Sequence, residues 1–278
     1  MLDLDVNTIT PAVLDTLTGV EDPRTREVLD SLVRHIHDFV REVGLTEAEW
    51  ARGVDFLTRT GQLCSPTRQE VILLSDVLGV TMLVDAVNHR RSDGATENSV
   101  LGPFFREDRP TLEQGADISA GVPGTPLLVR ATVVDQAGDP VPGAAFDVWH
   151  SDADGHYDSD VPGLEGPAMR GTFHTDDSGR VAFRTVAPAS YPIPADGPVG
   201  ELMRTARRSV MRPAHVHVRI EAPGFQPVTT MLFRHDDPHL EADPVFGVKR
   251  SLLAVFEPAD DEIPAEVLEH TFVLDPVD

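Results

Sequence analysis

Residues 212–220 read Arg-Pro-Ala-His-Val-His-Val-Arg-Ile, and their alternation of polar and apolar side chains predicts a β-strand. Successive side chains of a strand point to opposite faces, so His215 and His217 lie on one face and the apolar residues between and after them lie on the other. Two imidazoles at positions i and i+2 of one strand can bind a single metal ion. The same stretch also fits histidines that are exposed or hydrogen-bonded, and the pattern alone leaves both interpretations open.

Further short β-stretches follow residue 100 and are separated by turns rich in Gly, Pro and Asp. They cover residues 127–134, 145–149, 180–186, 215–220, 228–233 and 270–274. We see no helical crossover between them long enough for a parallel sheet, so we expect a mainly antiparallel β-sandwich in residues 101–278. The turn-rich residues 135–143 predict a hairpin-like unit between the first two strands.

The first hundred residues predict helices instead. Apolar residues recur with helical spacing over residues 24–43. Two Thr-x-x-Glu capping boxes, at residues 46–49 and 67–70, begin two further helices, the second of them over residues 71–89. The expected fold class is therefore α+β, with a helical N-terminal domain in residues 1–100 that precedes the sandwich.

Composition and charge exclude several kinds of partner. The chain has 23 Lys and Arg against 46 Asp and Glu, and its net charge of −23 repels nucleic acid and anionic membrane surfaces. The apolar run from Val77 to Val87 is interrupted by Asp85 and is too short to span a bilayer. Cys64 is the only cysteine, which excludes an internal disulfide, and no signal sequence opens the chain. We therefore expect the protein to be located in the cytoplasm.

Tyrosine is rare in this chain, because Tyr157 and Tyr191 are the only two among 278 residues. Tyr157 ends an acidic, Gly-containing stretch that follows a predicted strand, and Tyr191 lies among three prolines that fix its backbone outside regular structure. Loops on a rigid scaffold commonly carry ligands. If both phenols face His215 and His217, they form a hard, oxygen-rich donor set suited to Fe(III). A tyrosine packed at a loop edge is the structural alternative.

Two other interpretations stay open at this point. His150, His156 and His174 could complete a histidine-rich zinc site with the pair on the strand, although such a site leaves the placement of the two tyrosines unexplained. The composition and strand pattern also permit a transthyretin-like β-sandwich that binds a small molecule or a partner without iron.

The order of these residues closely resembles that of the intradiol ring-cleaving dioxygenases. The matching residues are Tyr157, Tyr191, the Arg-Pro-Ala-His-Val-His of residues 212–217 and the Glu-Asn-Ser-Val-Leu-Gly-Pro-Phe-Phe of residues 97–105. The resemblance covers nearly the whole chain, through residues 56–64, 73–79 and 86–89 and the Phe-Gly-Val-Lys of residues 246–249, and it is greatest to the hydroxyquinol 1,2-dioxygenase branch. Members of the family are non-haem Fe(III) enzymes that open 1,2-dihydroxybenzenes between the two hydroxyls.

The resemblance implies a role for each matching residue. Tyr157, Tyr191, His215 and His217 would bind the iron, Tyr191 would leave it and take up a proton when substrate binds, and Arg212 would stabilise negative charge on the ring. The substrate-binding residues that the resemblance implies are Leu73, Asp76, Val100, Gly102, Pro103, Phe104, Ile193, Pro194, Arg212 and Met231. It also implies a homodimer through the N-terminal helices, with a lipid bound at the dimer interface as in family relatives.

Asp76 and Met231 bear on the choice of substrate. An acceptor carboxylate in an apolar pocket can bind the additional hydroxyl of hydroxyquinol, whereas the structural alternative is that Asp76 caps a turn or pairs with an arginine. Many family members carry glutamine or histidine where this chain has Met231, and a thioether cannot donate their hydrogen bond. We expect both atoms of O2 to be inserted between the hydroxyl-bearing carbons of hydroxyquinol, giving 3-hydroxy-cis,cis-muconate or maleylacetate. Catechol or a substituted catechol, giving a cis,cis-muconate, is the alternative substrate.

Overall fold

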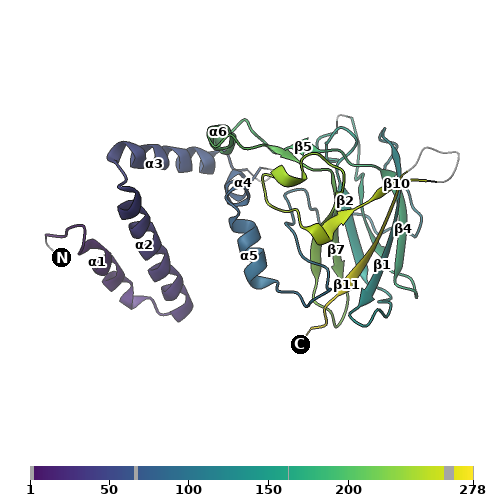
Figure 1. Ribbon diagram of the computed structural model, residues 1–278, viewed down its shortest axis with the longest axis horizontal. Coiled ribbons are helices and arrows are strands. Elements are labelled where there is room, and N and C mark those ends of the chain that lie inside the picture. Colours follow the sequence, from purple (N-terminus) through teal and green to yellow (C-terminus); the bar gives the residue numbers. More distant parts are fainter. Residues whose placement is uncertain (1–2, 66–67, 162, 260–265, 278) are drawn as a thin grey trace. The chain divides into compact units, whose positions relative to one another are not determined.

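The structure is a computed structural model that describes residues 3–65, 68–161, 163–259 and 266–277. By their internal contacts the residues divide into two units, Met1–Arg59 and Thr60–Asp278 (Figure 1). The expected boundary near residue 100 stays a prediction, because a division by contacts does not test where a separately folding domain ends. Within the described residues no helix is both long enough and apolar enough to cross a membrane.

The first unit is helical. It contains α1 (Ile9–Thr16), the 3-10 helix η1 (Leu17–Gly19), α2 (Pro23–Val43) and most of α3 (Glu47–Gln62). The first predicted capping box is observed, since the backbone N–H of Thr46 donates to the Glu49 carboxylate at 2.9 Å and that of Glu49 donates to the Thr46 hydroxyl at 3.3 Å. The sequence therefore predicted both where α2 lies and where α3 begins.

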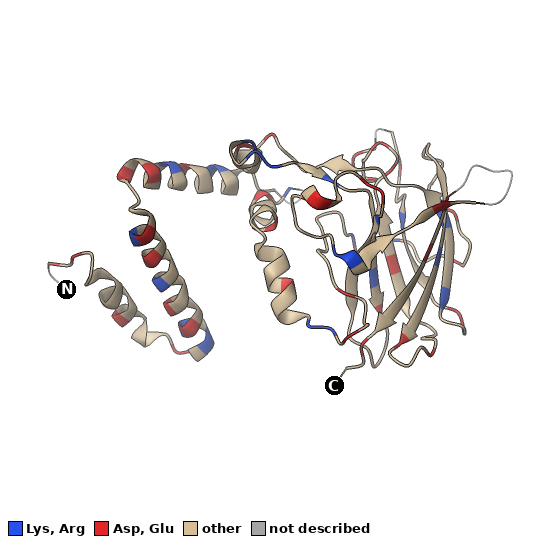
Figure 2. Cartoon of the chain, in the orientation of Figure 1, with Lys and Arg blue, Asp and Glu red and all other residues tan. Residues whose placement is uncertain are grey.

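The helix predicted over residues 71–89 is interrupted, which corrects that prediction. It forms α4 (Glu70–Val77) and α5 (Val80–Asn88), because Gly79 between them adopts a left-handed φ of +73° that ends α4. Thr67, the first residue of the second capping box, lies outside the described residues. Val77 packs in one apolar cluster with residues of α6 (Pro198–Thr205), a helix that was not predicted. Figure 2 shows charged residues all along α2, whereas α5 is almost uncharged.

The remainder of the second unit is built from two main sheets. Their strand orders are β10-β11-β1-β4 and β3-β2-β7-β8-β9, and β5 and β6 form a separate pair. The bounds are β1 (Pro126–Asp135), β2 (Ala145–His150), β3 (Arg170–His174), β4 (Arg180–Val186), β5 (Tyr191–Pro192), β6 (Met211–Arg212), β7 (His215–Glu221), β8 (Val228–Arg234), β9 (Leu253–Ala254), β10 (Phe256–Pro258) and β11 (Glu266–Leu274), with short 3-10 helices η2 (Leu240–Ala242) and η3 (Arg250–Leu252). The α+β class is confirmed. Two pairs, β1 with β11 and β8 with β9, are parallel.

The prediction of a hairpin-like unit across residues 127–149 is wrong. β1 pairs with β4 and β11, whereas β2 pairs with β3 and β7, so residues 136–144 connect the two sheets. Turn-forming residues predict where the chain changes direction, but the choice of sheet for the next strand depends on distant side chains.

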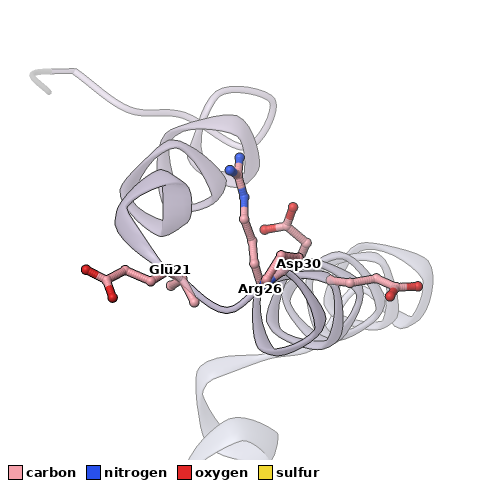
Figure 3. Close-up of a pocket in the computed structure, with 6 residues that line it drawn as sticks. Glu21, Arg26 and Asp30 are labelled. Carbon is pink, nitrogen blue, oxygen red and sulfur yellow. The ribbon is translucent and has the colours of Figure 1, made fainter.

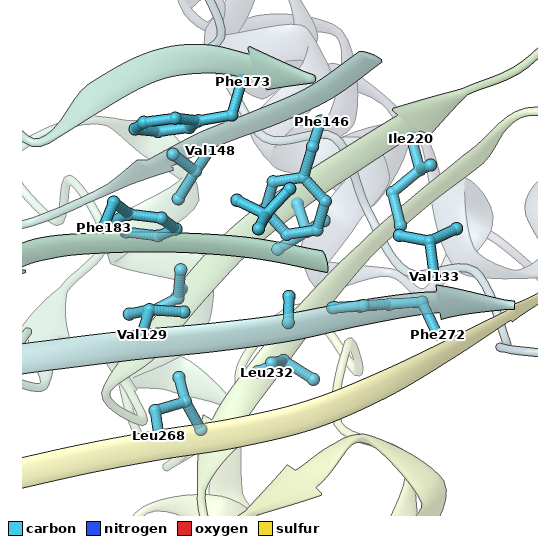
Figure 4. Close-up of a cluster of buried hydrophobic side chains, with 14 of the residues drawn as sticks. Val129, Val133, Phe146, Val148, Phe173, Phe183, Ile220, Leu232, Leu268 and Phe272 are labelled. Atoms are coloured by element: carbon cyan, nitrogen blue, oxygen red, sulfur yellow. The ribbon is translucent and has the colours of Figure 1, made fainter. Parts of the chain in front are cut away.

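Aromatic side chains fill the core between the two sheets. Phe173 of β3 stacks on Phe183 of β4 with ring centroids 5.0 Å apart, and Phe146 of β2 meets Phe272 of β11 edge to face at 5.6 Å. Figure 4 shows these rings among the aliphatic side chains of both sheets. The packed core makes β7, an interior strand of its sheet, a rigid support for side chains on its other face.

Candidate active site

The alternation of β7 places its two histidines together. Val216 and Ile220 are buried in the core between the sheets, so His215 and His217 lie on the opposite face of the strand, as predicted. Both imidazoles are nonetheless buried. Trp149 of β2, the partner of His217 in the strand register, stacks on the His217 ring with centroids 4.6 Å apart.

Both tyrosines reach these histidines and are buried beside them. Tyr157 lies in the loop after β2. Tyr191 begins β5, where it pairs with Arg212 of β6. The sequence interpretation of irregular backbone around Tyr191 missed this short pair, which proline permits because Pro192 sits at the end of an edge strand.

Four polar atoms of these side chains converge. The Tyr157 hydroxyl lies 3.3 Å from that of Tyr191 and 3.4 Å from His215 Nε2, and the Tyr191 hydroxyl lies 3.5 Å from the same nitrogen. His215 Nε2 lies 3.2 Å from His217 Nε2. Four ligand atoms that are each about 2 Å from one tetrahedral ion lie about 3.3 Å from one another. The four separations of 3.2–3.5 Å match this spacing. These four side chains are called the donor set below.

The imidazoles are in the protonation state that a metal requires. His215 Nδ1 lies 2.7 Å from the Pro213 carbonyl, which can only accept, so Nδ1 carries the hydrogen and Nε2 presents its lone pair. Burial lowers the pKa of His215 well below its usual value, and the charge of Arg212 adds to the effect. Burial, followed by the neighbouring His215, likewise lowers the pKa of His217. Both rings are therefore neutral at pH 7.

Burial affects the phenols in the opposite sense. It raises the pKa of Tyr157 well above its usual value, and Tyr191 adds to the rise, whereas the charges of Arg212 and Arg170 oppose it. Without a cation Tyr157 is a neutral phenol at pH 7. A bound cation would reverse that preference, so metal binding at this site would be coupled to proton release.

Arg212 borders the donor set. Its Nη1 lies 3.3 Å from His215 Nε2 and 3.5 Å from the Tyr191 hydroxyl. Its Nε donates to Asp243 at 3.2 Å, and its Nη2 lies 3.3 Å from Met231 Sδ. Asp243 and Met231 therefore contact two nitrogens of the guanidinium. Its third nitrogen, Nη1, faces the four converging atoms.

Comparison with known proteins accounts for this combination of residues. A family model described as "Dioxygenase" matches residues 100–276, and one described as "Catechol dioxygenase N terminus" matches residues 22–96. The chain is 46% identical over 276 residues to a 6-chlorohydroxyquinol 1,2-dioxygenase from Cupriavidus pinatubonensis, with 99% of each chain covered. The chain belongs to the intradiol ring-cleavage dioxygenase family.

Two further relatives are similar to this intradiol dioxygenase over nearly its whole length. A hydroxyquinol 1,2-dioxygenase from Rhizobium sp. is 43% identical over 273 residues, which are 94% of this chain and 92% of the relative. The crystal structure of hydroxyquinol 1,2-dioxygenase from Pseudomonas putida has a TM-score of 0.93 at 45% identity and covers 98% of this chain and 99% of its own. The family is known to use non-haem Fe(III), with which two phenols and two imidazoles are chemically compatible.

The three histidines of the alternative zinc site are engaged elsewhere or exposed in this intradiol dioxygenase. His150 Nδ1 lies 2.7 Å from the Ser151 carbonyl and its Nε2 lies 2.8 Å from the Thr185 hydroxyl, so both ring nitrogens have partners. Burial lowers the pKa of His150 to about 4. His156 and His174 are exposed. These positions give no support to the histidine-rich zinc site.

Four of the expected substrate-binding residues share one apolar cluster. Leu73 of α4, Val100, Ile193 after β5 and Met231 of β8 all contribute to it. Met231 is the strand partner of His217, which brings the cluster to the edge of the donor set.

Residues 102–104 form another part of the surroundings. Gly102 has φ +75°, and a Cβ at this position would lie 3.0 Å from His217 Cε1, so only glycine lets the backbone approach this closely. Phe104 stacks on Tyr157 with ring centroids 3.9 Å apart and an interplanar angle of 9°. Pro103 and Pro194 are exposed.

Asp76 of α4 is a buried carboxylate. Its Oδ1 accepts a hydrogen bond from the Thr81 hydroxyl at 2.6 Å. Burial raises the pKa of Asp76, whereas the Thr81 hydrogen bond and the charge of Arg212 oppose the rise. The Thr81 bond also ties α4 to α5, which gives Asp76 a structural role at this turn.

The sequence interpretation missed the side chains that hold the site in place. They include Asp243 on Arg212 and Trp149 on His217. They also include Arg170, which forms a buried ion pair with Asp158 and donates to the Phe104 carbonyl at 2.9 Å. Of these, only Asp158 offered a local signal, because it directly follows Tyr157.

A cavity of about 400 Å³ in the first unit takes no part in this site. It is lined by Val20, Glu21, Pro23, Arg26, Glu27 and Asp30 (Figure 3). All six residues precede residue 60, whereas the donor set lies entirely in the second unit.

Proposed function

We propose that this chain is a non-haem Fe(III) intradiol dioxygenase that acts on hydroxyquinol (benzene-1,2,4-triol). The reaction would break the ring bond between the two adjacent hydroxyl-bearing carbons and add both atoms of O2, giving 3-hydroxy-cis,cis-muconate, a tautomer of maleylacetate. The convergence of two phenol oxygens and two imidazole nitrogens carries the proposal. The substrate is supported by relatives at 43–46% identity that are named for hydroxyquinol or 6-chlorohydroxyquinol.

Tyr157, Tyr191, His215 and His217 would hold the iron. Phenolate oxygens are hard, anionic ligands, which favour Fe(III) over Fe(II). When bound, Fe(III) supplies Lewis acidity that favours the deprotonated diol and activates its ring toward O2.

The surrounding residues would bind the substrate and receive its protons. The Tyr191 phenolate would take one hydroxyl proton of the diol. Arg212, 3.5 Å from the Tyr191 hydroxyl, would stabilise negative charge that develops on the ring and its oxygens. Phe104 covers the Tyr157 ring, which supports Tyr157 as the ligand that stays in place.

Asp76 would distinguish hydroxyquinol from catechol. Thr81 donates to its Oδ1, and the third hydroxyl of hydroxyquinol would donate to the same carboxylate. Catechol lacks that hydroxyl and would form one hydrogen bond fewer with the carboxylate, which costs binding free energy.

Replacement of Asp76 by alanine is expected to reduce the preference for hydroxyquinol. The ratio of kcat/KM for hydroxyquinol to that for catechol should fall by about 10-fold to 100-fold, the effect of one hydrogen bond to a charged group. Steady-state kinetics on both substrates measure the ratio, and Thr81→Val, which keeps the carboxylate, is the matched control. An unchanged ratio would remove Asp76 from the selectivity argument, and a wild-type protein that prefers catechol would refute the hydroxyquinol assignment.

Protein loaded with Fe(III) is expected to be red-brown, because charge transfer from tyrosinate to Fe(III) absorbs visible light. Anaerobic addition of hydroxyquinol should change the band as Tyr191 leaves the metal. Spectra before and after the addition measure both effects, and zinc-loaded protein is the colourless control because Zn²⁺ has a filled d shell. Fully ferric protein without visible absorption would contradict the central proposal.

We also propose a homodimer formed through the N-terminal helices, with a lipid at its interface. Large apolar side chains of α2 and α3 are exposed, namely Val28, Leu32, Ile36, Phe39, Val40, Val43, Trp50, Val54 and Leu57. Exposed apolar surface of this extent favours association with another protein, and most soluble oligomers are formed by copies of one chain. A mass of 30.3 kDa in sedimentation equilibrium would contradict the dimer. Mass spectrometry of an organic extract tests for the lipid.

A further inference from the structure

Asp237 lies in the loop after β8 and is buried. Its Oδ2 accepts a hydrogen bond from the backbone N–H of Ala214 at 2.8 Å and another from the Ser190 hydroxyl. Its Oδ1 accepts a third from the backbone N–H of His239 at 2.8 Å, which anchors the carboxylate within its own loop. One carboxylate oxygen therefore joins two distant segments of the chain.

Both of these segments lead directly into the donor set. Ser190 precedes Tyr191 and Ala214 precedes His215, and the two donor residues are 24 positions apart. The pairing of β5 with β6 joins Tyr191 to Arg212, three residues before His215. Asp237 adds a second link, at the residues that directly precede Tyr191 and His215.

The two segments differ in what else holds them. His215 is paired within the interior strand β7, and its Nδ1 is held by the Pro213 carbonyl at 2.7 Å. Tyr191 lies in the two-residue strand β5, which pairs with the equally short β6. The Tyr191 segment is also held by the Ala189 N–H, which donates to the Asp152 carbonyl at 3.1 Å, and by the bond from Ser190 to Asp237. Tyr191 therefore depends on single hydrogen bonds, whereas His215 is supported by an interior strand.

We propose that Asp237 is a positioning residue that holds the Tyr191 phenol against His215 at the metal centre. Asp237 acts through Ser190 and Ala214, its hydrogen-bond partners next to the two ligands. The identity of Tyr191 and His215 as iron ligands rests on the proposed function, whereas the mechanical link between them does not.

Tyr157 provides an internal comparison. The residue after it, Asp158, is held by a separate buried ion pair with Arg170. Loss of the Asp237 carboxylate should therefore disturb Tyr191 and leave Tyr157 in place.

The test uses the fact that the chain has only two tyrosines. In the metal-free, full-length chain labelled with ¹³Cζ-tyrosine, NMR gives one signal for each, which Tyr157→Phe and Tyr191→Phe assign. Asp237→Asn should shift and broaden the Tyr191 signal more than the Tyr157 signal, because asparagine keeps one acceptor oxygen for the three donors that Asp237 serves. Ser190→Ala should move the same signal. Asp236→Asn, at an exposed neighbouring residue, is the matched control and should move neither signal.

Iron gives a second measurement. In Fe(III)-loaded protein, Asp237→Asn should alter the tyrosinate charge-transfer band and lower kcat by about 10-fold to 100-fold, the usual effect of removing a group that orients a metal ligand. Should Asp237→Asn fail to fold, Ser190→Ala decides, because it keeps the carboxylate and its bond to Ala214.

A Tyr191 signal that stays in place in Ser190→Ala overturns the proposal, and so does an equal movement of both tyrosine signals. Failure of the proposed function would look different. Wild-type protein would be colourless or inactive with iron, while the metal-free tyrosine signals would still report on the link through Asp237.

Discussion

Tyr157→Phe is expected to remove stoichiometric iron and visible colour, and to lower kcat/KM for hydroxyquinol by more than about 100-fold. That figure is the upper end of the loss for a residue that only orients a ligand, and Tyr157 would be a ligand itself. The substitution removes one oxygen from a buried set of four atoms and leaves the ring stacked under Phe104. Iron content by elemental analysis, the visible spectrum and steady-state kinetics measure the three effects.

His156→Asn is the matched control for this variant. His156 directly precedes Tyr157, but its side chain is 53% exposed, so iron and turnover should be retained. Loss of metal in His156→Asn would support the histidine-rich zinc site instead. Full iron occupancy and colour in Tyr157→Phe would show that Tyr157 is not a ligand.

Arg212→Gln is expected to lower kcat for hydroxyquinol by about 100-fold to 1,000-fold, the effect of losing a preorganised donor where charge develops. Iron content and KM should change little, because Arg212 borders the donor set without belonging to it. The variant should also be less stable by about 3–5 kcal/mol, since it leaves Asp243 as a buried carboxylate without its cation.

The double variant Arg212→Gln/Asp243→Asn separates the two effects. Removing the second charge should restore much of the stability in denaturant unfolding, whereas kcat should stay low. Recovery of kcat together with stability would show that Arg212 acts only by holding the fold together.

The residues of the donor set were identifiable from the sequence because their placement follows local rules. Alternation along one strand is enough to put His215 and His217 on the same face. The rarity of tyrosine drew attention to Tyr157 and Tyr191, and the family resemblance supplied the order in which all four occur. The position of α2 followed from the helical spacing of its apolar residues, and the beginning of α3 followed from its capping box.

The supporting contacts were out of reach because each joins residues that are distant in the chain. Asp243 meets Arg212 across 31 positions and Asp237 meets Ala214 across 23, without a motif at either end. The break at Gly79 was missed for another reason. A single glycine within an apolar helical run is tolerated in many helices, and only its observed left-handed φ ends this one.

The parallel pairing of β1 with β11 affects the order in which this protein can be made. Arg130 and Glu269, partners in that pairing, are 139 positions apart, so β1 leaves the ribosome long before its neighbour is synthesised. Until then one edge of β1 has no strand to pair with, and such an edge invites association with other chains. The sheet that supports the histidine strand from across the core can thus close only late in translation.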